Sequence, residues 1–404
     1  MSNPAISTTK RFDKERPPSA NSDTVSQPAP ATRQKSAGRI DAIDWLRGLA
    51  VVLMIQTHLY GWWTSPAAKK TMAYAWSRWL GGLPFRMFLL MAGMAIAIRF
   101  EGQIARGVER REMVRATFRR GFEVLVLAYA FRLQEYALSL FWDWHDILRV
   151  DILNCIGASM MLAAPLVAPR RGRPQIAACL IIAAVFLALG PIVGPTRAFV
   201  GLPLPLRHLT SYIGGPQPMA WFALFPAFAW LLVGIAVGHW WARENRKGQL
   251  GRAFVVSAAV GAVLMTAVIL TRRYDPYIIR YPSDYAQQMG PGTFFYRLGS
   301  IGVLALLGYL LTTGPFRGRF SVMRIFGQTS LLVYWVHVEL VYGLLFKRFA
   351  NKLSMGQATV GFLLMTAAML GLSLLRLKYW RGWRHALDAL KGRGGNLPSS
   401  SSPL

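Results

Sequence analysis

The first hydrophobic segment of the chain contains three side chains that can carry charge and take part in chemistry. In a helix, Asp44, Arg47, Val51, Ile55 and His58 follow one another at steps of three or four residues and share one face, called here the polar stripe. An unpaired ionisable group at membrane depth costs at least about 2.5–3.5 kcal/mol, so such groups normally face the bundle interior and serve a function there. The polar stripe therefore predicts a functional face.

Each polar position on this face has a structural and a functional interpretation. Asp44 and Arg47 have the i, i+3 spacing of an ion pair that would fix the packing of the helix start. Gly48 beside them allows another helix to approach closely. His58 lies about 16 Å beyond Arg47 along the axis. Its imidazole is either a buried core group with one hydrogen bond or a catalytic group, and the residues alone leave both open.

Later hydrophobic segments contain further candidates. Arg132 and Glu135 share a helix face in the third segment, where they form a structural ion pair or part of a proton relay or binding surface. Asn154 lies deep in the fourth segment, where its amide can hold a carbonyl group, orient His58 or join two helices. His337 ends a late segment, on the side of the membrane expected for His58.

The other histidines are weaker candidates. His145 and Asp146 lie at the expected outer mouth, where they can act as acid and base or simply be solvated. His239 and His385 lie at expected cytoplasmic helix ends, where a cation complements the helix dipole. The helix dipole is therefore enough to explain His239 and His385 without a catalytic role.

Composition predicts an integral membrane protein. Hydrophobic residues make up 53% of the 404 residues, and they form uncharged blocks about as long as a bilayer-spanning helix. Within a bilayer each block must satisfy its own backbone hydrogen bonds, so we expect an all-α, polytopic transmembrane helix bundle. We expect about ten spans, at residues 44–63, 80–98, 121–141, 147–168, 175–194, 220–241, 253–271, 294–313, 326–346 and 358–375.

The distribution of basic residues predicts the orientation. The formal charge of +28 and the sequence pI near 11.0 would by themselves suggest a nucleic-acid partner. However, 30 of the 46 Lys and Arg residues fall in the two tails and the even-numbered loops, against 11 in the odd-numbered loops. This bias predicts that both termini are cytoplasmic. The uneven distribution explains the excess of Lys and Arg by membrane topology and by contact with anionic lipids. We therefore expect no nucleic-acid partner.

Three regions are expected along the chain. Residues 1–38 are polar and lack the apolar region of a signal peptide, so we expect a disordered cytoplasmic tail. Residues 39–385 form one transmembrane domain, and residues 386–404 form a second disordered tail. Cys155 and Cys179 fall inside predicted spans and are interpreted as small buried residues; no spacing of Cys, His, Asp or Glu indicates a metal site.

Three loops on the expected outer side combine aromatic residues with Asp, Arg and His. They are residues 142–146, 196–219 and 272–292. One interpretation is an aromatic belt at the membrane interface. The other is an extracytoplasmic pocket in which flat rings pack on a sugar-like acceptor.

Several segments together resemble one family. The sequence RIDAIDWLRGLAVVLMIQTH, residues 39–58, is similar to the first helix of bacterial proteins in the heparan-α-glucosaminide N-acetyltransferase-like family, within a broader group of multi-span acyltransferases. Four later segments resemble later helices of that family in the same order: RWLGGLPFRMFLLMAG (78–93), LRVDILNCIGASMML (148–162), ALFPAFAWLLVGIAVG (223–238) and FGQTSLLVYWVH (326–337). The resemblance covers residues 39–346.

The resemblance implies a transmembrane acyltransferase that moves an acyl group, typically acetyl, from cytoplasmic acyl-CoA to a hydroxyl or amine of a sugar or glycan. On this view Arg47 meets the phosphates of the donor, and the pantetheine arm runs outward along the polar stripe. His58 then acts as a general base or as a transient acyl carrier. Further candidates are Asp44 and His337 for catalysis and Arg78, Asn154 and Arg132 for donor binding.

The chain departs from the lysosomal branch of this family at two places. That branch has a histidine in its first loop, which the family account treats as catalytic, and an Asp before its second helix. Residues 59–78 contain no His here, and the matching stretch GGLPF contains no Asp. The chemistry would therefore fall to His58 or another histidine, and heparan itself is not favoured as the acceptor.

Two other functions stay open from the sequence. A transporter or flippase for a sugar-linked or lipid-linked substrate would line its pathway with Arg132 and Glu135, and Gly190-Pro191 suggests a discontinuous helix. A non-catalytic scaffold would leave the polar stripe unexplained. The expected partners are the lipid bilayer, acyl-CoA and a sugar or glycan acceptor, in a multi-pass protein of the plasma (bacterial inner) membrane. The acceptor, the acyl length and whether a homodimer forms are left open.

Overall fold

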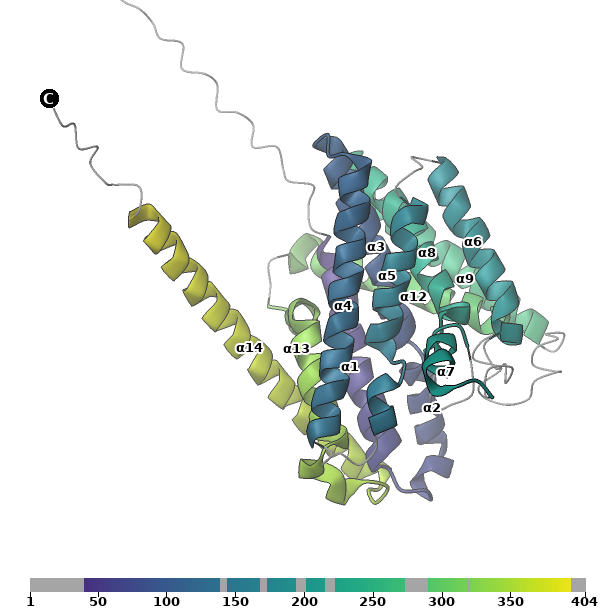
Figure 1. The fold of residues 1–404 in the computed structure, drawn as a ribbon, viewed down its shortest axis with the longest axis vertical. Helices are drawn as coiled ribbons and strands as arrows, with labels where there is room; N and C mark the ends of the chain where they lie inside the picture. Colours follow the sequence, from purple (N-terminus) through teal and green to yellow (C-terminus); the bar gives the residue numbers. More distant parts are fainter. Residues whose placement is uncertain are drawn as a thin grey trace, which may run out of the picture. The chain divides into compact units, whose positions relative to one another are not determined.

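A computed structural model describes residues 40–138, 144–167, 173–193, 201–214, 222–272, 290–317 and 320–393 of the chain. These ranges belong to one compact unit, Arg39–Leu404, and within them the backbone forms helices and no strand, which confirms the all-α fold class (Figure 1). The α-helices are α1 Asp41–Trp63, α2 Met72–Gly81, α3 Pro84–Ala105, α4 Arg110–Leu138, α5 Ile152–Val167, α6 Arg173–Val193, α7 Leu204–Ser211, α8 Leu224–Arg246, α9 Leu250–Thr271, α12 Pro291–Thr312, α13 Val322–Tyr342 and α14 Met355–Arg393. Short 3-10 helices include η2 Trp144–Leu148 and η5 Leu344–Phe349.

Six segments of the described chain are long and apolar enough to cross a membrane, and the protein is therefore an integral membrane protein. They are Met72–Ala105, Arg173–Val193, Leu224–Arg246, Leu250–Thr271, Pro291–Thr312 and Met355–Tyr379. About ten spans were expected. That count and the cytoplasmic position of both termini stay predictions.

Three further helices have the length of a span but a more polar composition. α1, α4 and α13 contain 23, 29 and 21 residues, against the roughly 20 that a bilayer requires. Their polar side chains lower their hydropathy, and several of these side chains meet in the site described below. α5 is apolar but has only 16 residues.

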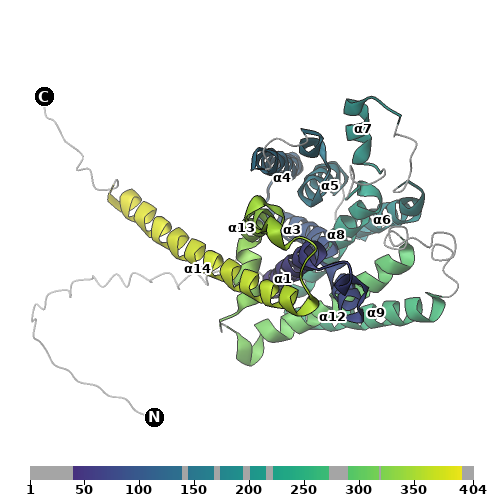
Figure 2. The ribbon, with the colours of Figure 1, turned by 90° about the horizontal axis from the view of Figure 1, so that it is seen from below.

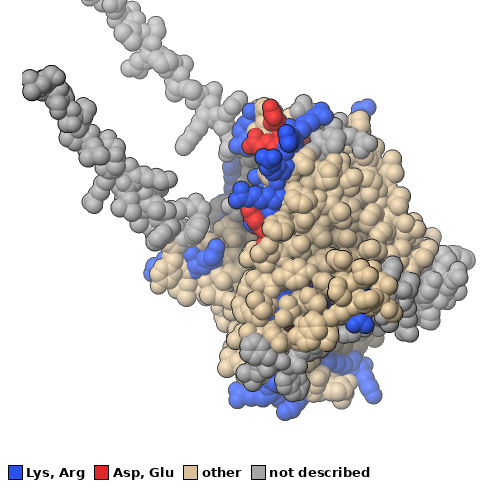
Figure 3. All heavy atoms as spheres, viewed as in Figure 1, with Lys and Arg blue, Asp and Glu red and all other residues tan. Residues whose placement is uncertain are grey.

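The outer surfaces of several helices are apolar. Val263 on α9, Ile181 on α6 and Leu364 on α14 are each more than 60% exposed. On the face shown in Figure 3, charged side chains gather towards the top and the bottom, and most of the surface between them is uncharged. Exposed apolar surface of this extent matches the hydrocarbon of a bilayer.

The helices pack in pairs around α1 and α3, which lie near the centre of the bundle (Figure 2). The most extensive contacts join α3 with α8, α9 with α12, α1 with α13, α4 with α5, and α6 with α8. A Cβ at Gly48 would overlap the carbonyl oxygen of Met323, and a Cβ at Gly327 would overlap that of Asp44. Small residues therefore let the backbones of α1 and α13 meet, as expected for Gly48.

The structure refines several predicted boundaries. α5 begins at Ile152, later than the predicted start at residue 147, and α14 continues past residue 386 to Arg393. α6 runs uninterrupted to Val193 with Pro191 inside it, so the discontinuous helix suggested by Gly190-Pro191 is not present. Most of the third predicted outer loop, residues 272–292, lies outside the described residues, as do parts of the other two loops. The whole of the first predicted tail and residues 394–404 of the second also lie outside them.

Candidate active site

The polar stripe of α1 faces the interior of the bundle, as predicted. α13 packs along this face, so that Val51 and Ile55 are fully buried and Asp44 is nearly so. Val51 and Ile55 belong to one apolar cluster with Phe326 and Val333 of α13. These side chains fill the middle of the stripe. The predicted path of a pantetheine arm along the stripe would therefore require these buried side chains to move, and it stays a prediction.

The first turns of α1 are held by ion pairs. Arg47 Nη1 donates to Asp44 Oδ1 at 3.3 Å, and Arg324 of α13 pairs with Asp41 at 3.3 Å. This supports the structural interpretation of the Asp44–Arg47 pair. Asp44 lies about 21 Å from His58 along α1, so it cannot take part directly in chemistry at that histidine.

The structure brings His58 and His337 together near the other end of α1. His58 Nδ1 lies 3.0 Å from His337 Nε2, and the two ring planes are 9° apart with centroids 5.2 Å apart. His337 is completely buried, whereas His58 is partly accessible. Residues separated by most of the sequence thus form one paired group.

Hydrogen bonding determines the tautomers of this histidine pair. His337 Nδ1 lies 2.6 Å from the carbonyl oxygen of Val333, and a carbonyl only accepts, so this nitrogen carries the proton. The Nε2 of a neutral His337 then accepts the Nδ1–H of His58. The lone pair of a neutral His58 is left on its own Nε2, which has no hydrogen-bond partner among the described residues. His58 Nε2 is therefore the atom at which the pair can take up a proton or an acyl group.

A buried ion cluster lies beside the histidine pair. The guanidinium group of Arg132 on α4, with a side chain only 5% exposed, binds the carboxylates of Glu135 and Asp151. Tyr334 of α13 donates to Asp151 Oδ2 at 3.5 Å. Asp151 is close enough to His58 to act on its charge electrostatically. The cluster thus joins α4, α13 and the start of α5 within electrostatic reach of His58.

Sequence reasoning misses Asp151 and Tyr334, although each has a local signal. Asp151 precedes the apolar run of α5 and is followed three residues later by Asn154. Asp151 Oδ1 accepts from the N–H of Ile152 at 2.8 Å, and Asn154 Oδ1 accepts from the N–H of Asp151 at 3.2 Å, a reciprocal arrangement like a capping box. Tyr334 lies three residues before His337, which places both on one helix face.

Asn154 lies in the first turn of α5 and not deep in a span. Its Oδ1 accepts from Asp151, and its Nδ2 donates to the hydroxyl of Tyr212 at the end of α7, at 3.2 Å. Tyr212 shares a 2.6 Å hydrogen bond with Tyr129, whose hydroxyl also lies 3.0 Å from His208 Nε2. Burial lowers the pKa of His208 and raises the pKa of Tyr212. Asn154 therefore joins α5 to a neutral hydrogen-bonded group, as in the helix-joining interpretation, and does not hydrogen-bond His58.

The predicted donor-binding arginines lie in different places. Arg78 is exposed on α2 and lies close enough to Tyr342, at the end of α13, to act on its hydroxyl electrostatically. Arg47 is 28% exposed at the opposite end of α1. Arg132 is engaged by two carboxylates. The structure therefore does not gather these three residues into one phosphate site.

The remaining histidines lie away from the pair. His239 Nδ1 on α8 lies 2.8 Å from Glu101 Oε1 on α3, and Arg246 donates to the other oxygen of Glu101 at 2.7 Å. This cluster joins two helices, which supports a structural role. His145 is exposed in η2, where its ring stacks on that of Trp144. The side chain of His385 lies outside the described residues.

The cysteines and possible metal ligands add no second centre to the described structure. Cys155 in α5 and Cys179 in α6 are buried, as interpreted from the sequence. Among the described residues, no three His, Cys, Asp or Glu side chains are grouped so that they could hold a metal ion.

Comparison with known proteins identifies the family. The family described as "Heparan-alpha-glucosaminide N-acetyltransferase, catalytic" matches residues 39–268, which is more than half of the 404 residues. The matched region contains His58, Arg132 and Asp151 but ends before His337. No curated protein matches the chain. From the family match and the apolar helices, we conclude that the chain belongs to the heparan-alpha-glucosaminide N-acetyltransferase catalytic family and is a membrane acetyltransferase by family.

Proposed function

We propose that the protein transfers an acetyl group from acetyl-CoA to a hydroxyl or amino group of a sugar or glycan, with His58 as the reacting residue. The observation that carries this proposal is the histidine pair, because His337 orients His58 and leaves the Nε2 lone pair of His58 available. Membership of an acetyltransferase family supplies the type of reaction.

His58 Nε2 can serve this reaction in two ways. As a general base, it takes the proton of the acceptor group while that group attacks the thioester carbonyl, and it returns the proton to the departing CoA thiolate. As an acyl carrier, it attacks the carbonyl itself, and the C–S bond breaks to release the CoA thiolate. The acceptor then attacks the acetyl-imidazole and displaces neutral His58, and the proton that the acceptor loses neutralises the thiolate. Both routes use the same nitrogen atom.

His337 and Asp151 support either route in the same way. When His58 Nε2 takes up a proton or an acetyl group, its ring becomes positively charged. The Nδ1–H···Nε2 bond to His337 then becomes a charge-assisted hydrogen bond, roughly twice as strong as a neutral one. The carboxylate of Asp151, held by Arg132 and Tyr334, adds electrostatic stabilisation from close by.

Arg47 and Arg78 are the proposed contacts for the donor phosphates, and they imply different routes. Arg47 lies about 16 Å from His58 along α1. A donor bound there reaches His58 only if α1 and α13 separate at Val51 and Ile55, which fill the stripe. Arg78 is exposed at the end of the bundle that carries His58. A donor bound there needs no such opening, but it would approach from the side that the sequence predicts to be extracytoplasmic. Acetyl-CoA binding should therefore weaken in only one of the variants Arg47→Gln and Arg78→Gln.

Aromatic rings beside His58 support a sugar acceptor. The ring of Tyr342 lies 5.5 Å from that of His58 and 5.5 Å from that of Trp62. Aromatic rings pack well against flat apolar surfaces and carry a polar edge for hydrogen bonding. The pair can therefore hold the face of a sugar ring while one of its hydroxyl or amino groups meets His58 Nε2.

The proposal is tested by acetyl transfer in the purified protein, followed as release of CoA thiol from acetyl-CoA. His58→Ala should lower the rate by about 10²–10⁴, the usual contribution of a positioned acid–base group. His337→Ala should lower it less, because His58 keeps its own reactive nitrogen. Tyr60→Phe is the matched control, since its hydroxyl contacts Thr359 of α14 at 2.8 Å and not the histidine pair. A wild-type rate in folded His58→Ala would contradict the proposal.

A further inference from the structure

Two arginine side chains meet at Gly82, in the turn between α2 and α3. Arg86, buried in the first turn of α3, donates to the carbonyl oxygen of Gly82. Arg297 of α12 donates to the carbonyl oxygen of Trp79, and its Cζ lies 4.9 Å from the centre of the Trp79 side-chain ring. Nη2 of Arg297 would lie only 2.7 Å from a Cβ placed on Gly82. The two guanidinium groups are therefore neighbours.

The two arginines are like charges placed side by side. Arg86 and Arg297 lie close enough to repel each other, and no described carboxylate forms an ion pair with Arg297. α3 begins at Pro84 and α12 at Pro291, so each arginine lies within two turns of a helix N-terminus with its partial positive charge. An anion between the two guanidinium groups would turn this repulsion into attraction.

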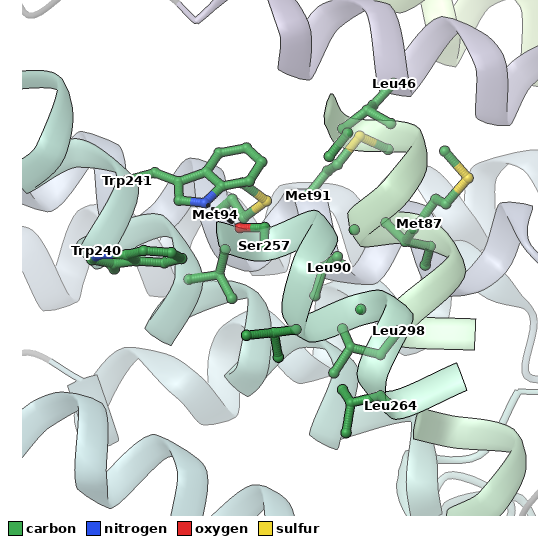
Figure 4. A pocket seen from close by; sticks show the side chains of 16 residues that line it. Leu46, Met87, Leu90, Met91, Met94, Trp240, Trp241, Ser257, Leu264 and Leu298 are labelled. Carbon is green, nitrogen blue, oxygen red and sulfur yellow. Dashed lines mark hydrogen bonds between the residues drawn. The ribbon is translucent and has the colours of Figure 1, made fainter. Parts of the chain in front are cut away.

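An apolar cavity of about 150 Å³ lies between α1, α3, α8, α9 and α12 (Figure 4). Met87 and Leu298, which directly follow the arginines in sequence, line it, as do Leu90 and Ile301 one turn further along. The hydroxyl of Ser257, also in the lining, already donates to Ala253 O and accepts from Trp241 Nε1. An apolar cavity of this size stays dry and takes up hydrocarbon.

The cavity reaches the lipid-facing surface of the bundle. Val260 of α9 lines the cavity and is 54% exposed. α9 is one of the helices apolar enough to cross a membrane. A hydrocarbon chain can therefore enter the cavity from the surrounding bilayer, and two of the residues that line the cavity directly follow the two arginines in sequence.

We propose that this site binds an anionic phospholipid of the bilayer, with its phosphate between Arg86 and Arg297 and one acyl chain in the cavity. Guanidinium groups match phosphate oxygens with parallel N–H···O bonds, and basic pockets between transmembrane helices bind anionic headgroups. The arginines select an anion and the cavity selects a hydrocarbon chain. A site that has the arginines and the cavity together favours a molecule with both an anionic group and a hydrocarbon chain.

A phospholipid bound at this site would also stabilise the end of the bundle that carries His58. Gly81, next to Gly82, packs against Thr57 of α1, and Thr57 is the residue before His58. The phosphate would connect α3 and α12 at the α2–α3 turn that rests on this part of α1. The bound lipid is therefore expected to stabilise the region around the histidine pair.

The test measures the thermal unfolding midpoint of the detergent-solubilised full-length protein with added phosphatidylglycerol, phosphatidylcholine or inorganic phosphate. Phosphatidylglycerol should raise the midpoint by several degrees, because a ligand at a hundred times its dissociation constant favours the folded state about a hundred-fold. Phosphatidylcholine and inorganic phosphate should shift it little. An equal shift with phosphatidylcholine would overturn the role of charge, and an equal shift with phosphate would overturn the role of the chain.

Paired variants test the two halves of the site separately. Arg297→Gln should abolish the shift with phosphatidylglycerol, whereas Arg272→Gln, at the exposed end of α9, should keep it. Val260→Trp places a large side chain at an exposed residue of the cavity lining and should reduce the shift. Val263→Trp, 67% exposed on the same helix and outside the cavity lining, should not. A wild-type shift in both Arg297→Gln and Val260→Trp would overturn the proposal. If Arg297→Gln does not fold, the comparison of the two tryptophan variants still decides.

Discussion

Removing the charge of Asp151 should destabilise the bundle by an amount that follows from its contacts. Asp151 receives a charge-assisted hydrogen bond from Arg132, a side chain only 5% exposed, and caps α5 through Ile152 N–H. Asp151→Asn keeps an oxygen for the cap and loses the charged contact, so the expected cost is about 1.5–3 kcal/mol. Asp151→Ala also loses the cap, which adds about 0.5–2 kcal/mol.

Thermal unfolding of the solubilised protein, followed by tryptophan fluorescence, measures this cost. Asp146→Asn is the matched control, because the Asp146–Arg149 pair is solvent-exposed on the carboxylate side and should contribute at most about 1 kcal/mol. In an Arg132→Met background, Asp151→Asn should cost much less than it does alone, since the two residues act as one pair. Equal costs in both backgrounds, or a wild-type midpoint for Asp151→Asn, would refute the reasoning.

Three further predictions address packing, pH and the support of His58. Gly327→Leu should destabilise the folded protein by at least about 1–3 kcal/mol and impair acetyl transfer, because the leucine side chain would overlap the backbone of Asp44 and push α1 and α13 apart. Gly61→Ala is the control: its Cβ meets nothing within 4 Å, so it should change the unfolding midpoint little. Burial lowers the pKa of His208 from its ordinary value of about 6.5. The contribution of neutral His208 to stability is therefore complete above about pH 6.5 and should be lost as the pH falls from there towards the folded-state pKa. His208→Gln should flatten this part of a plot of unfolding free energy against pH. Tyr334→Phe should lower the transfer rate with little change in acetyl-CoA binding, because it removes a hydrogen bond to Asp151 and no proposed donor contact; a selective loss of acetyl-CoA affinity would contradict this.

Much of the fold follows from local properties of the sequence. The apolar blocks predict helices because a bilayer offers no other partner for the backbone, and the three- and four-residue steps from Asp44 to His58 predict a face turned inward. The close approach of a helix at Gly48 also follows from its missing side chain. Helix ends are harder to predict, since α5 starts at a cap made by Asp151 and Asn154 within a segment that hydropathy alone extends to residue 147.

The centre of the candidate site depends on contacts that a single sequence does not encode locally. His58 and His337 are both recognisable as ionisable groups at helix ends, but their 3.0 Å contact depends on how α13 packs against α1. Arg132 and Glu135 are visible as a helical pair, whereas the third member, Asp151, lies on another helix. The packed middle of the polar stripe was not predictable either, because helical spacing tells which way Val51 and Ile55 face but not what lies opposite.

The most direct test of the central claim, that the His58 imidazole performs the transfer with His337 as its support, is chemical rescue. The rate of acetyl transfer from acetyl-CoA is measured for folded His58→Ala and for the double variant His58→Ala/His337→Ala, with and without added imidazole. We expect imidazole to restore part of the lost rate in His58→Ala, where it can occupy the vacated space and donate to His337 Nε2, and to restore much less in the double variant. A His58→Ala protein that transfers acetyl groups at the wild-type rate without imidazole would contradict the account.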